Sequence, residues 1–231
     1  MEGPLAGVFV TGTGTEVGKT VVAAALARSL ASAGLAVNVF KPAVTGLEEP
    51  GETDPELLRR AAGSAQSDEE IAPYRYGPPA SPHLAAALAG EEIDPARLLA
   101  AARAAGAGAD RLVCEGVGGL LVPLTSRVTL GMREELDSPY LVSDLAVDLG
   151  LPVAIAASPG LGTINHTLLT IAAARGAGLE VAAVVLTPWP EEPSEIERSN
   201  RETIAALGGV EVKTLPRLDL SEPDSWPTLS L

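Results

Sequence analysis

GTGTEVGKT, residues 12–20, is the stretch that decides the fold of this chain. It follows an apolar run, Leu5–Val10, and leads into a long alanine-rich segment with helical spacing. A glycine-rich turn between a strand and a helix that ends in Gly-Lys-Thr is the context of a phosphate-binding loop. Its glycines let backbone N–H groups converge on phosphate oxygens, and the helix adds its positive dipole end. The alternative is an ordinary glycine-rich turn.

The spacing of this loop departs from the common pattern. G-x-x-x-x-G-K-[ST] requires glycine at position 13, where the chain has Thr13. Counting from Gly12 instead gives a loop that is one residue longer. In either spacing Lys19 would reach the β- and γ-phosphates of a nucleotide, and the Thr20 hydroxyl would hold Mg²⁺. The loop therefore predicts a nucleotide site that belongs to one particular branch of the phosphate-loop proteins.

Strand and helix patterns alternate along the whole chain. This alternation predicts an α/β fold of the phosphate-loop NTPase type, with a mostly parallel central sheet and helices on both faces. The expected strands are Leu5–Val10, Ala36–Phe40, Arg111–Glu115, Pro152–Ala157, Val181–Leu186 and Val210–Leu215. The expected helices lie near Gly18–Ala33, Asp54–Ala62, Pro95–Ala105, Pro139–Gly150, Thr163–Arg175 and Pro193–Leu207, with Gly34, Gly150 and Gly178 as caps.

Chemically suggestive residues follow the predicted strands. Lys41 comes directly after one strand and Glu115 ends another, and ligands of parallel sheets bind at the carboxyl ends of the strands. Lys41 could bind a phosphate or carboxylate, or could simply reach out to solvent. Glu115 could hold Mg²⁺, or could be a solvated residue of a glycine-rich turn. Asp54 could serve as a metal ligand, although Asp-Pro-Glu also suits the N-cap of a helix.

Composition narrows the function classes. The chain has 231 residues and reads as one domain over 1–231, with a loosely held tail at 221–231. A net charge of −14 argues against a nucleic-acid partner. The N-terminus has no basic region of a signal peptide, and no apolar run reaches membrane-spanning length, so we expect a cytoplasmic protein without a membrane partner. The single cysteine, Cys114, suits a core position.

Taken together, these motifs resemble the dethiobiotin synthetase family. The matching pieces run in the family's order from Val10 to Thr170, with weaker likeness to about Leu220, and its loop has the same additional residue. The pieces are VTGTGTEVGKT, FKPAVTG, the aspartate of ETDPELL, SPHLAA, EGVGGLLVPL, SDLAVDLGLPV and GLGTINHTLLT.

The resemblance implies a reaction and its participants. Enzymes of this family use 7,8-diaminopelargonate, CO₂, ATP and Mg²⁺. One amine captures CO₂ as a carbamate, the γ-phosphate of ATP activates the carbamate, and the second amine closes a cyclic urea. Lys19 and Lys41 would be catalytic, neutralising the carbamate and γ-phosphate. Thr20, Asp54 and Glu115 would hold the metal.

The resemblance also implies binding roles. Thr15, Lys41 and Thr45 would contact the carbamate or diamine. The family works as a homodimer, and Asn165 is the candidate for a contact across the subunits. The residues expected to line the nucleotide are Glu16, Val17, Gly18, Lys19, Thr20, Val21, Asp54, Glu115, Gly116, Val117, Gly118, Thr187, Pro188, Pro216, Arg217 and Leu218.

Some positions depart from the family pattern. Thr187-Pro188 stands where the family often carries an asparagine that reads adenine, and a hydroxyl lacks the paired donor and acceptor of an amide. Gly14 stands where the family often has aspartate.

The alternative is a partitioning or cell-division ATPase of the ParA/MinD type. Such a switch carries an additional lysine early in the loop, where this chain has Thr13, and often a basic amphipathic C-terminal helix. A glutamine-dependent amidation enzyme would need a further domain, and the retained Lys41, Asp54 and Glu115 argue against a non-catalytic nucleotide-binding module.

Overall fold

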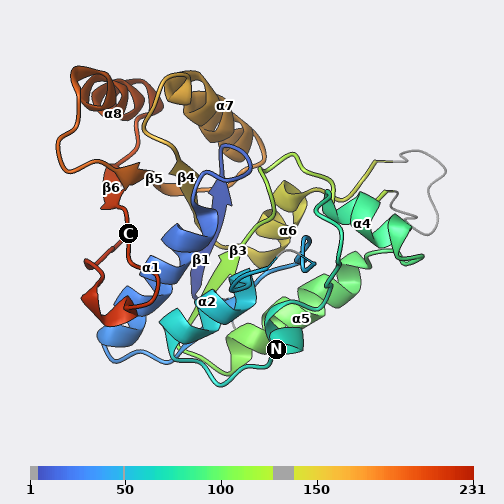
Figure 1. The fold of residues 1–231 in the computed structure, drawn as a ribbon. Helices are drawn as coiled ribbons and strands as arrows, with labels where there is room; N and C mark the ends of the chain where they lie inside the picture. The colour runs from blue at the N-terminus through green and yellow to red at the C-terminus, as the bar shows by residue number, and fades with distance from the viewer. Residues whose placement is uncertain (1–4, 49, 127–137) are drawn as a thin grey trace.

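The computed structural model describes residues 5–48, 50–126 and 138–231. Within these ranges, six strands form one sheet in the order β2-β3-β1-β4-β5-β6, and every neighbouring pair is parallel. Helices lie on both faces of the sheet (Figure 1). The expected α/β fold with a parallel central sheet is confirmed. Position 49, inside a loop expected at Gly46–Pro55, lies outside the described residues.

Strands and helices alternate along the described residues, except that several helices lie between the second and third strands. The strands are β1 (Gly7–Gly12), β2 (Val37–Phe40), β3 (Arg111–Glu115), β4 (Val153–Ala157), β5 (Val181–Trp189) and β6 (Val212–Pro216). The helices are α1 (Lys19–Ser32), α2 (Asp54–Ala62), α3 (Asp68–Ile71), α4 (Pro82–Leu88), α5 (Pro95–Ala107), α6 (Val142–Leu149), α7 (Thr163–Gly176), α8 (Glu195–Gly208) and the 3₁₀ turn η1 (Pro223–Ser225).

The structure confirms the expected elements and moves some of their ends. β3 and α2 have the expected bounds, and the three expected glycine caps adopt positive φ. β1 begins and ends two residues later than expected because Thr11 and Gly12 still pair with Ile155 and Ala156 of β4. Pairing with neighbours, which the local sequence does not reveal, sets where a strand ends.

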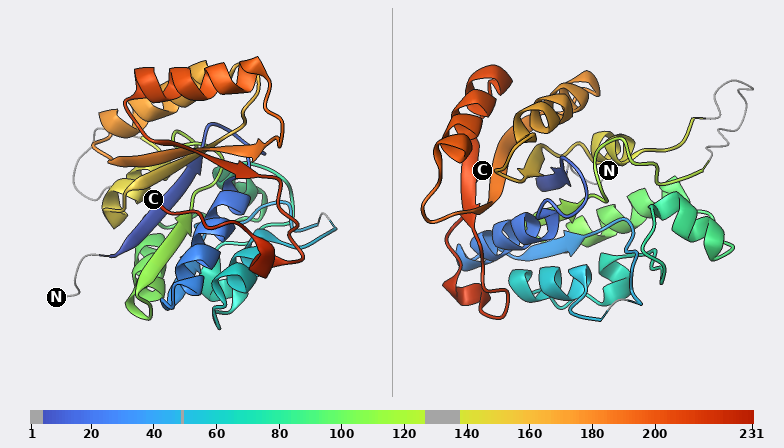
Figure 2. Two further views of the ribbon diagram at one scale, coloured as in Figure 1. Left: turned by 90° about the vertical axis from the view of Figure 1, so that its left-hand side faces the viewer. Right: turned by 45° about the horizontal axis from the view of Figure 1, so that its top comes forward.

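Two apolar clusters cover the two faces of the sheet. One contains Phe9 and Phe40 and buries the apolar sides of α5, α6, α7 and α8. The other contains Val10 and Val39 and buries α1 and α2. Figure 2 shows the sheet between these two layers. Since strand residues alternate between faces, adjacent residues of β1 and of β2 supply opposite clusters.

The C-terminal tail differs from expectation. Residues 221–231 were expected to be loosely held, but the tail runs along α1 on the molecule's surface (Figure 2). Leu229 is 5% exposed within the cluster around α1, and its backbone N–H donates to Ser29 Oγ at 2.9 Å. Arg28 forms an ion pair with Asp224. The expectation was wrong because it weighed the polar composition and missed the apolar anchors.

None of the helices in the described ranges has both the length and the apolar character that crossing a membrane requires.

Close strand contact makes Gly7 a sensitive position. A Cβ atom on Gly7 would lie 1.9 Å from the Leu112 carbonyl oxygen, which belongs to the paired strand β3. We expect Gly7→Ala to lower the free energy of unfolding by about 1–3 kcal/mol or more, because backbone must shift to admit the methyl group. Urea denaturation measures this loss.

Gly176→Ala is the matched control for Gly7→Ala. Gly176 lies at the end of α7, and no described atom lies within 4 Å of its Cβ position. Alanine there is expected to be neutral or to stabilise by about 0.4–1 kcal/mol. Equal stability of the two variants would contradict the close contact between β1 and β3.

Candidate active site

The order of the strands brings the predicted motifs together. β3 lies between β2 and β1, so Glu115 at its carboxyl end stands between Lys41, which follows β2, and the phosphate loop, which follows β1. All three segments leave the same edge of the sheet because the strands are parallel. α1 and α2 then place Thr20 and Asp54 over this edge.

These segments meet in a compact cluster of charged and polar groups. Lys41 Nζ lies 2.6 Å from Asp54 Oδ2 and 2.6 Å from Glu115 Oε1. Thr20 Oγ1 lies 3.1 Å from Asp54 Oδ1 and 2.9 Å from Glu115 Oε1. Glu115 is fully buried and Lys41 is 5% exposed, whereas the Asp54 side chain is 41% exposed, so the cluster is shielded from water at the sheet and reaches solvent at Asp54. We call Thr20, Lys41, Asp54 and Glu115 the charged cluster.

Burial and mutual attraction compete in setting the protonation of these groups. Burial lowers the pKa of Lys41, but Glu115 and Asp54 more than offset it, so the pKa is raised and the lysine stays charged. Burial raises the pKa of Asp54, but Lys41 and the Thr20 hydroxyl bring it below its ordinary value. The pKa of Glu115 is raised because complete burial outweighs the attraction of Lys41.

The structure decides the alternatives for Lys41. A lysine reaching out from a strand end would expose its ammonium, but Lys41 turns inward onto two carboxylates. Its ammonium is therefore held between two carboxylates and does not extend into solvent.

The structure also separates Asp54 from the helix cap. Thr53 is the N-cap of α2: its backbone N–H donates to Glu56 Oε2 at 2.8 Å, as part of a capping box. Asp54 is the first helical residue and points toward Lys41 instead. The sequence Thr-Asp-Pro-Glu carries the S/T-x-x-E signature of this box, which could have identified Thr53 beforehand.

The phosphate loop is held in shape by its own lysine. Lys19 Nζ donates to the Gly14 carbonyl oxygen at 2.8 Å. Gly18 has φ 86° and Glu16 has φ 59°, so the loop turns twice through the left-handed region before α1 begins. Burial lowers the pKa of Lys19, although Glu115 attracts its charge. The loop residues thus expose backbone to the rim above Thr20.

Two further segments border the phosphate loop. A Cβ atom on Gly119 would lie 3.3 Å from the Gly12 carbonyl oxygen, so the turn after Glu115 packs directly on the loop. On the other side, a Cβ atom on Gly18 would lie 2.7 Å from Thr187 Cγ2. Thr187 is 3% exposed near the end of β5. Of the residues expected to line a nucleotide, Thr187 therefore adjoins the loop, and the 116–118 turn leads directly into Gly119, which contacts it.

The charged cluster suits a hard divalent cation. It offers a hydroxyl and two carboxylates, which are the oxygen ligands that Mg²⁺ prefers. Glu115 Oε2 is buried and makes no hydrogen bond within the described residues, so one carboxylate oxygen is left for a ligand. Among those residues no group of three or more His, Cys, Asp or Glu side chains could hold a metal. The residues present fit a cation shared with phosphate oxygens and water.

Other expected site residues lie farther from the cluster. Thr15 is exposed on the loop, and Thr45 is half-buried beyond Lys41. Asn165 is exposed in the first turn of α7. Pro216–Leu218 follow β6 at the sheet edge, where β6 pairs with β5. None of these forms a hydrogen bond to the charged cluster among the described contacts.

The structure shows surroundings for some residues that the sequence did not indicate. His166 is exposed and lines a cavity of about 220 Å³ with Gly12 and Thr13. Thr11, the residue before the loop, is fully buried, and its hydroxyl has no partner among the described residues. Cys114 is buried as expected, and burial raises the pKa of its thiol.

Comparison with known proteins accounts for this arrangement. The family described as "AAA domain" matches residues 6–224. The ATP-dependent dethiobiotin synthetase BioD of Anaeromyxobacter dehalogenans (strain 2CP-1 / ATCC BAA-258) is 46% identical over 202 residues, covering 87% of this chain and 85% of that protein. The chain belongs to the ATP-dependent dethiobiotin synthetase family. Membership in this family agrees with the phosphate loop and the cluster beside it.

More distant members of the family match over the same extent. The synthetase of Rhodococcus jostii (strain RHA1) is 41% identical, with 89% of this chain and 83% of the relative covered. That of Bacillus subtilis (strain 168) is 35% identical, with 89% and 84% covered. All three relatives are therefore matched over most of their length.

Replacing Lys41, the positively charged residue of the charged cluster, should destabilise the protein in a pH-dependent way. Lys41→Met leaves Glu115 and Asp54 without their shared ammonium, and we expect a loss of about 3–5 kcal/mol at neutral pH. The raised pKa of Glu115 then rises further, since the attraction of Lys41 is lost. A carboxyl group with a raised folded pKa favours folding below its unfolded pKa and loses that contribution as pH rises through the folded value.

Urea denaturation at about pH 8 and about pH 5 checks this prediction, because the deficit of Lys41→Met should shrink on acidification. Lys213→Met is the control, since Lys213 pairs with a largely exposed Glu211 and should change stability by less than about 1 kcal/mol at both pH values. A deficit of Lys41→Met that is the same at both pH values would argue against a charged Glu115 next to Lys41.

Proposed function

We propose that this chain carboxylates 7,8-diaminopelargonate with CO₂ and closes the ureido ring of dethiobiotin, with ATP consumed to ADP and phosphate. The observation that carries the proposal is the charged cluster beside the phosphate loop. A simple phosphate loop needs one lysine and one hydroxyl, but here a second, buried lysine faces the same rim. A reaction that brings a carbamate against a γ-phosphate needs such a second cation.

The proposed steps balance charge around the transferred phosphoryl group. One substrate amine takes up CO₂ as a carbamate. A carbamate oxygen attacks the γ-phosphorus, the bond to the β-phosphate oxygen breaks, and ADP leaves. The second amine then attacks the carbamate carbon, phosphate departs, and the ring closes. Anions crowd together at each step, so fixed cations and precise positioning supply the acceleration.

The proposal gives each residue of the cluster a separate task. Lys19 leaves the Gly14 carbonyl and binds the β- and γ-phosphates, and Lys41 binds the carbamate and the γ-phosphate. Asp54 and Glu115 fix the ammonium of Lys41 from below, through contacts of 2.6 Å. Fixed ion pairs reduce the reorganisation that the transition state requires. Thr15 and Thr45 would orient the carbamate or the diamine by their hydroxyl groups.

Thr20, Asp54 and Glu115 would hold Mg²⁺. The ion, when bound, neutralises negative charge on the phosphate oxygens. Glu16–Val21 and Glu115–Gly118 would line the nucleotide. Thr187, Pro188 and Pro216–Leu218 would lie around the base, where a threonine hydroxyl discriminates less between bases than an amide does.

We also propose that the chain works as a homodimer with Asn165 contributing to the substrate site of the partner subunit. Exposed leucines support a partner on this side: Leu121 is 67% exposed, Leu161 is 96% exposed and Leu169 is 61% exposed. Leu121 and Leu169 line the cavity beside Gly12 and Thr13. Exposed apolar side chains gathered in this way mark an interaction surface.

The decisive experiment is an assay of the purified protein with 7,8-diaminopelargonate, bicarbonate, Mg²⁺ and ATP. We expect a cyclic urea detected by mass spectrometry, with one ADP formed per ring. Omission of the diamine is the control and should abolish ADP formation. We expect the unaltered protein also to use CTP and GTP in place of ATP, because Thr187 discriminates little between bases. Thr187→Asn should restore a preference for ATP over both. ATP hydrolysis that requires added DNA or lipid, with no urea, would favour a partitioning switch instead.

The mass of the protein in solution tests the proposed pairing. Light scattering is expected to give about twice the 23.5 kDa of one chain. Leu161→Asp combined with Leu169→Asp should shift the mass toward one chain, because charged groups oppose burial of this surface. Val147→Asp is the control, since Val147 is also exposed, at 45%, but lies on α6. A single-chain mass for the unaltered protein would refute the dimer.

A further inference from the structure

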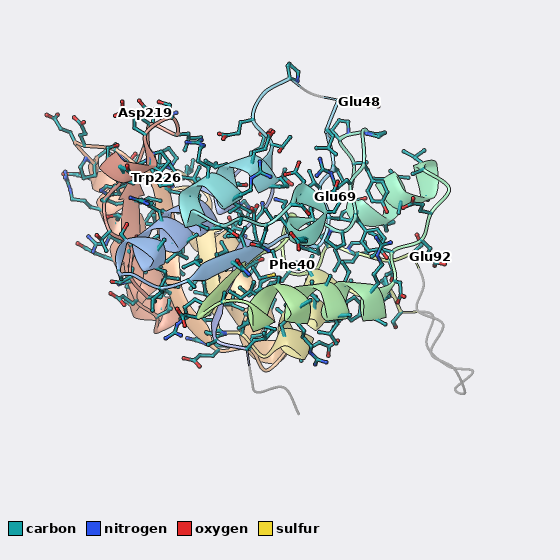
Figure 3. All side chains as sticks on the ribbon, turned by 90° about the horizontal axis from the view of Figure 1, so that it is seen from below. Phe40, Glu48, Glu69, Glu92, Asp219 and Trp226 are labelled. Atoms are coloured by element: carbon teal, nitrogen blue, oxygen red, sulfur yellow. The ribbon has the colours of Figure 1, made fainter. Side chains whose placement is uncertain are left out.

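The C-terminal strap, which we define as residues 219–229, connects two parts of the nucleotide site. It follows directly on Pro216–Leu218 and ends against α1, the helix that begins at the phosphate loop. In Figure 3, Asp219 and Trp226 lie close together on this strap, beside α1 and α2. No site role was expected for any residue of the strap.

The two sides of the phosphate loop differ in chemistry. On the β3 and β2 side of the phosphate loop stand Glu115 and Lys41, which are buried and bonded to each other. On the other side, Thr187 of β5 touches Gly18, and Trp189 of β5 pairs with Pro216 of β6. We therefore expect the base of a bound nucleotide to lie on the side of Thr187 and Pro216–Leu218, away from the charged cluster.

The turn immediately after Leu218 is closed by hydrogen bonds at Asp219. The Trp226 indole N–H donates to the Asp219 carbonyl oxygen at 2.7 Å. Ser221 donates to the Asp219 carboxylate through its backbone N–H at 2.9 Å and its hydroxyl at 2.6 Å. Asp219 thus accepts hydrogen bonds at both its backbone carbonyl oxygen and its side-chain carboxylate. These contacts fix the direction in which the chain leaves β6.

The far end of the strap is fastened to α1. Leu229 is buried and its N–H donates to Ser29 Oγ, while Arg28 pairs with Asp224. Leu218 and Trp226 pack on the same apolar cluster as Val17 and Val21, which flank Lys19 in the phosphate loop. The strap therefore holds Pro216–Leu218 at a fixed position relative to the phosphate loop.

We propose that the C-terminal strap is a positioning element for the nucleotide base, with Trp226 and Leu229 as its positioning residues. This inference rests on the nucleotide site of the proposed function. When the strap is fastened, Pro216–Leu218 are ordered before the base arrives. When it is loosened, only a fraction of molecules presents them correctly, and the affinity for ATP falls by that fraction.

The experiment separates the base from the phosphates. Calorimetry with Mg²⁺ measures the dissociation constants of a non-hydrolysable ATP analogue and of inorganic tripolyphosphate, which lacks the base. Trp226→Phe keeps an aromatic ring but removes the N–H donor, and Leu229→Ala loosens the anchor on α1. We expect the analogue to bind about threefold and about tenfold more weakly, respectively, and tripolyphosphate to bind unchanged. Thr228→Ala, at an exposed strap position, is the control and should change neither.

Each other outcome overturns the inference. If the melting temperature falls while the affinity for the analogue is unchanged, the strap is only structural. If both ligands bind more weakly by the same factor, the strap acts on the phosphate loop or on the whole fold. The measurement needs no turnover, so a protein that makes no cyclic urea can still show the difference between the two ligands. Failure of the unaltered protein to bind the analogue contradicts both proposals.

Discussion

A buried carboxylate that needs a cation governs the arrangement of this protein's functional edge. Glu115 ends the strand between β2 and β1 and is fully buried, so its charge is tolerated only with a partner at close range. Lys41 supplies that partner from β2, and Thr20 adds a hydroxyl from α1. Asp54 then completes the charge balance from α2. Side chains from β2, α1 and α2 thus converge on this one group at the end of β3.

The same constraint explains why the phosphate loop is not sufficient to define the chemistry. The loop alone describes a large class of nucleotide-binding proteins. What distinguishes this chain is the ammonium held 2.6 Å from two carboxylates at the neighbouring strand end. Membership in the dethiobiotin synthetase family, which the matches over nearly the entire chain establish, is consistent with that second cation.

Local sequence predicted the elements well and their arrangement only in outline. The phosphate loop, β3 and α2 carry strong local signals, so their positions were predicted directly. The placement of β3 between β2 and β1 was not predictable, because 70 residues (41–110) separate β2 (ending at Phe40) from β3 (beginning at Arg111), and only tertiary pairing decides their contact. Consequently the sequence alone did not decide whether the Lys41 side chain binds an anionic group or extends into solvent. The tail was misjudged because Trp226 and Leu229 stand in a polar segment whose average composition hides them.

The bond between Lys19 and the Gly14 carbonyl oxygen has a consequence for the energetics of ligand exchange. An arriving triphosphate competes with the main chain for one ammonium, so capture replaces an existing bond and the net gain is only the difference between the two. If Lys19 binds the triphosphate as proposed, the Gly14 carbonyl can accept its ammonium again when the product leaves. The bond to Gly14 would thus lower the net strength of capture, so the empty loop is itself a competitor of the triphosphate.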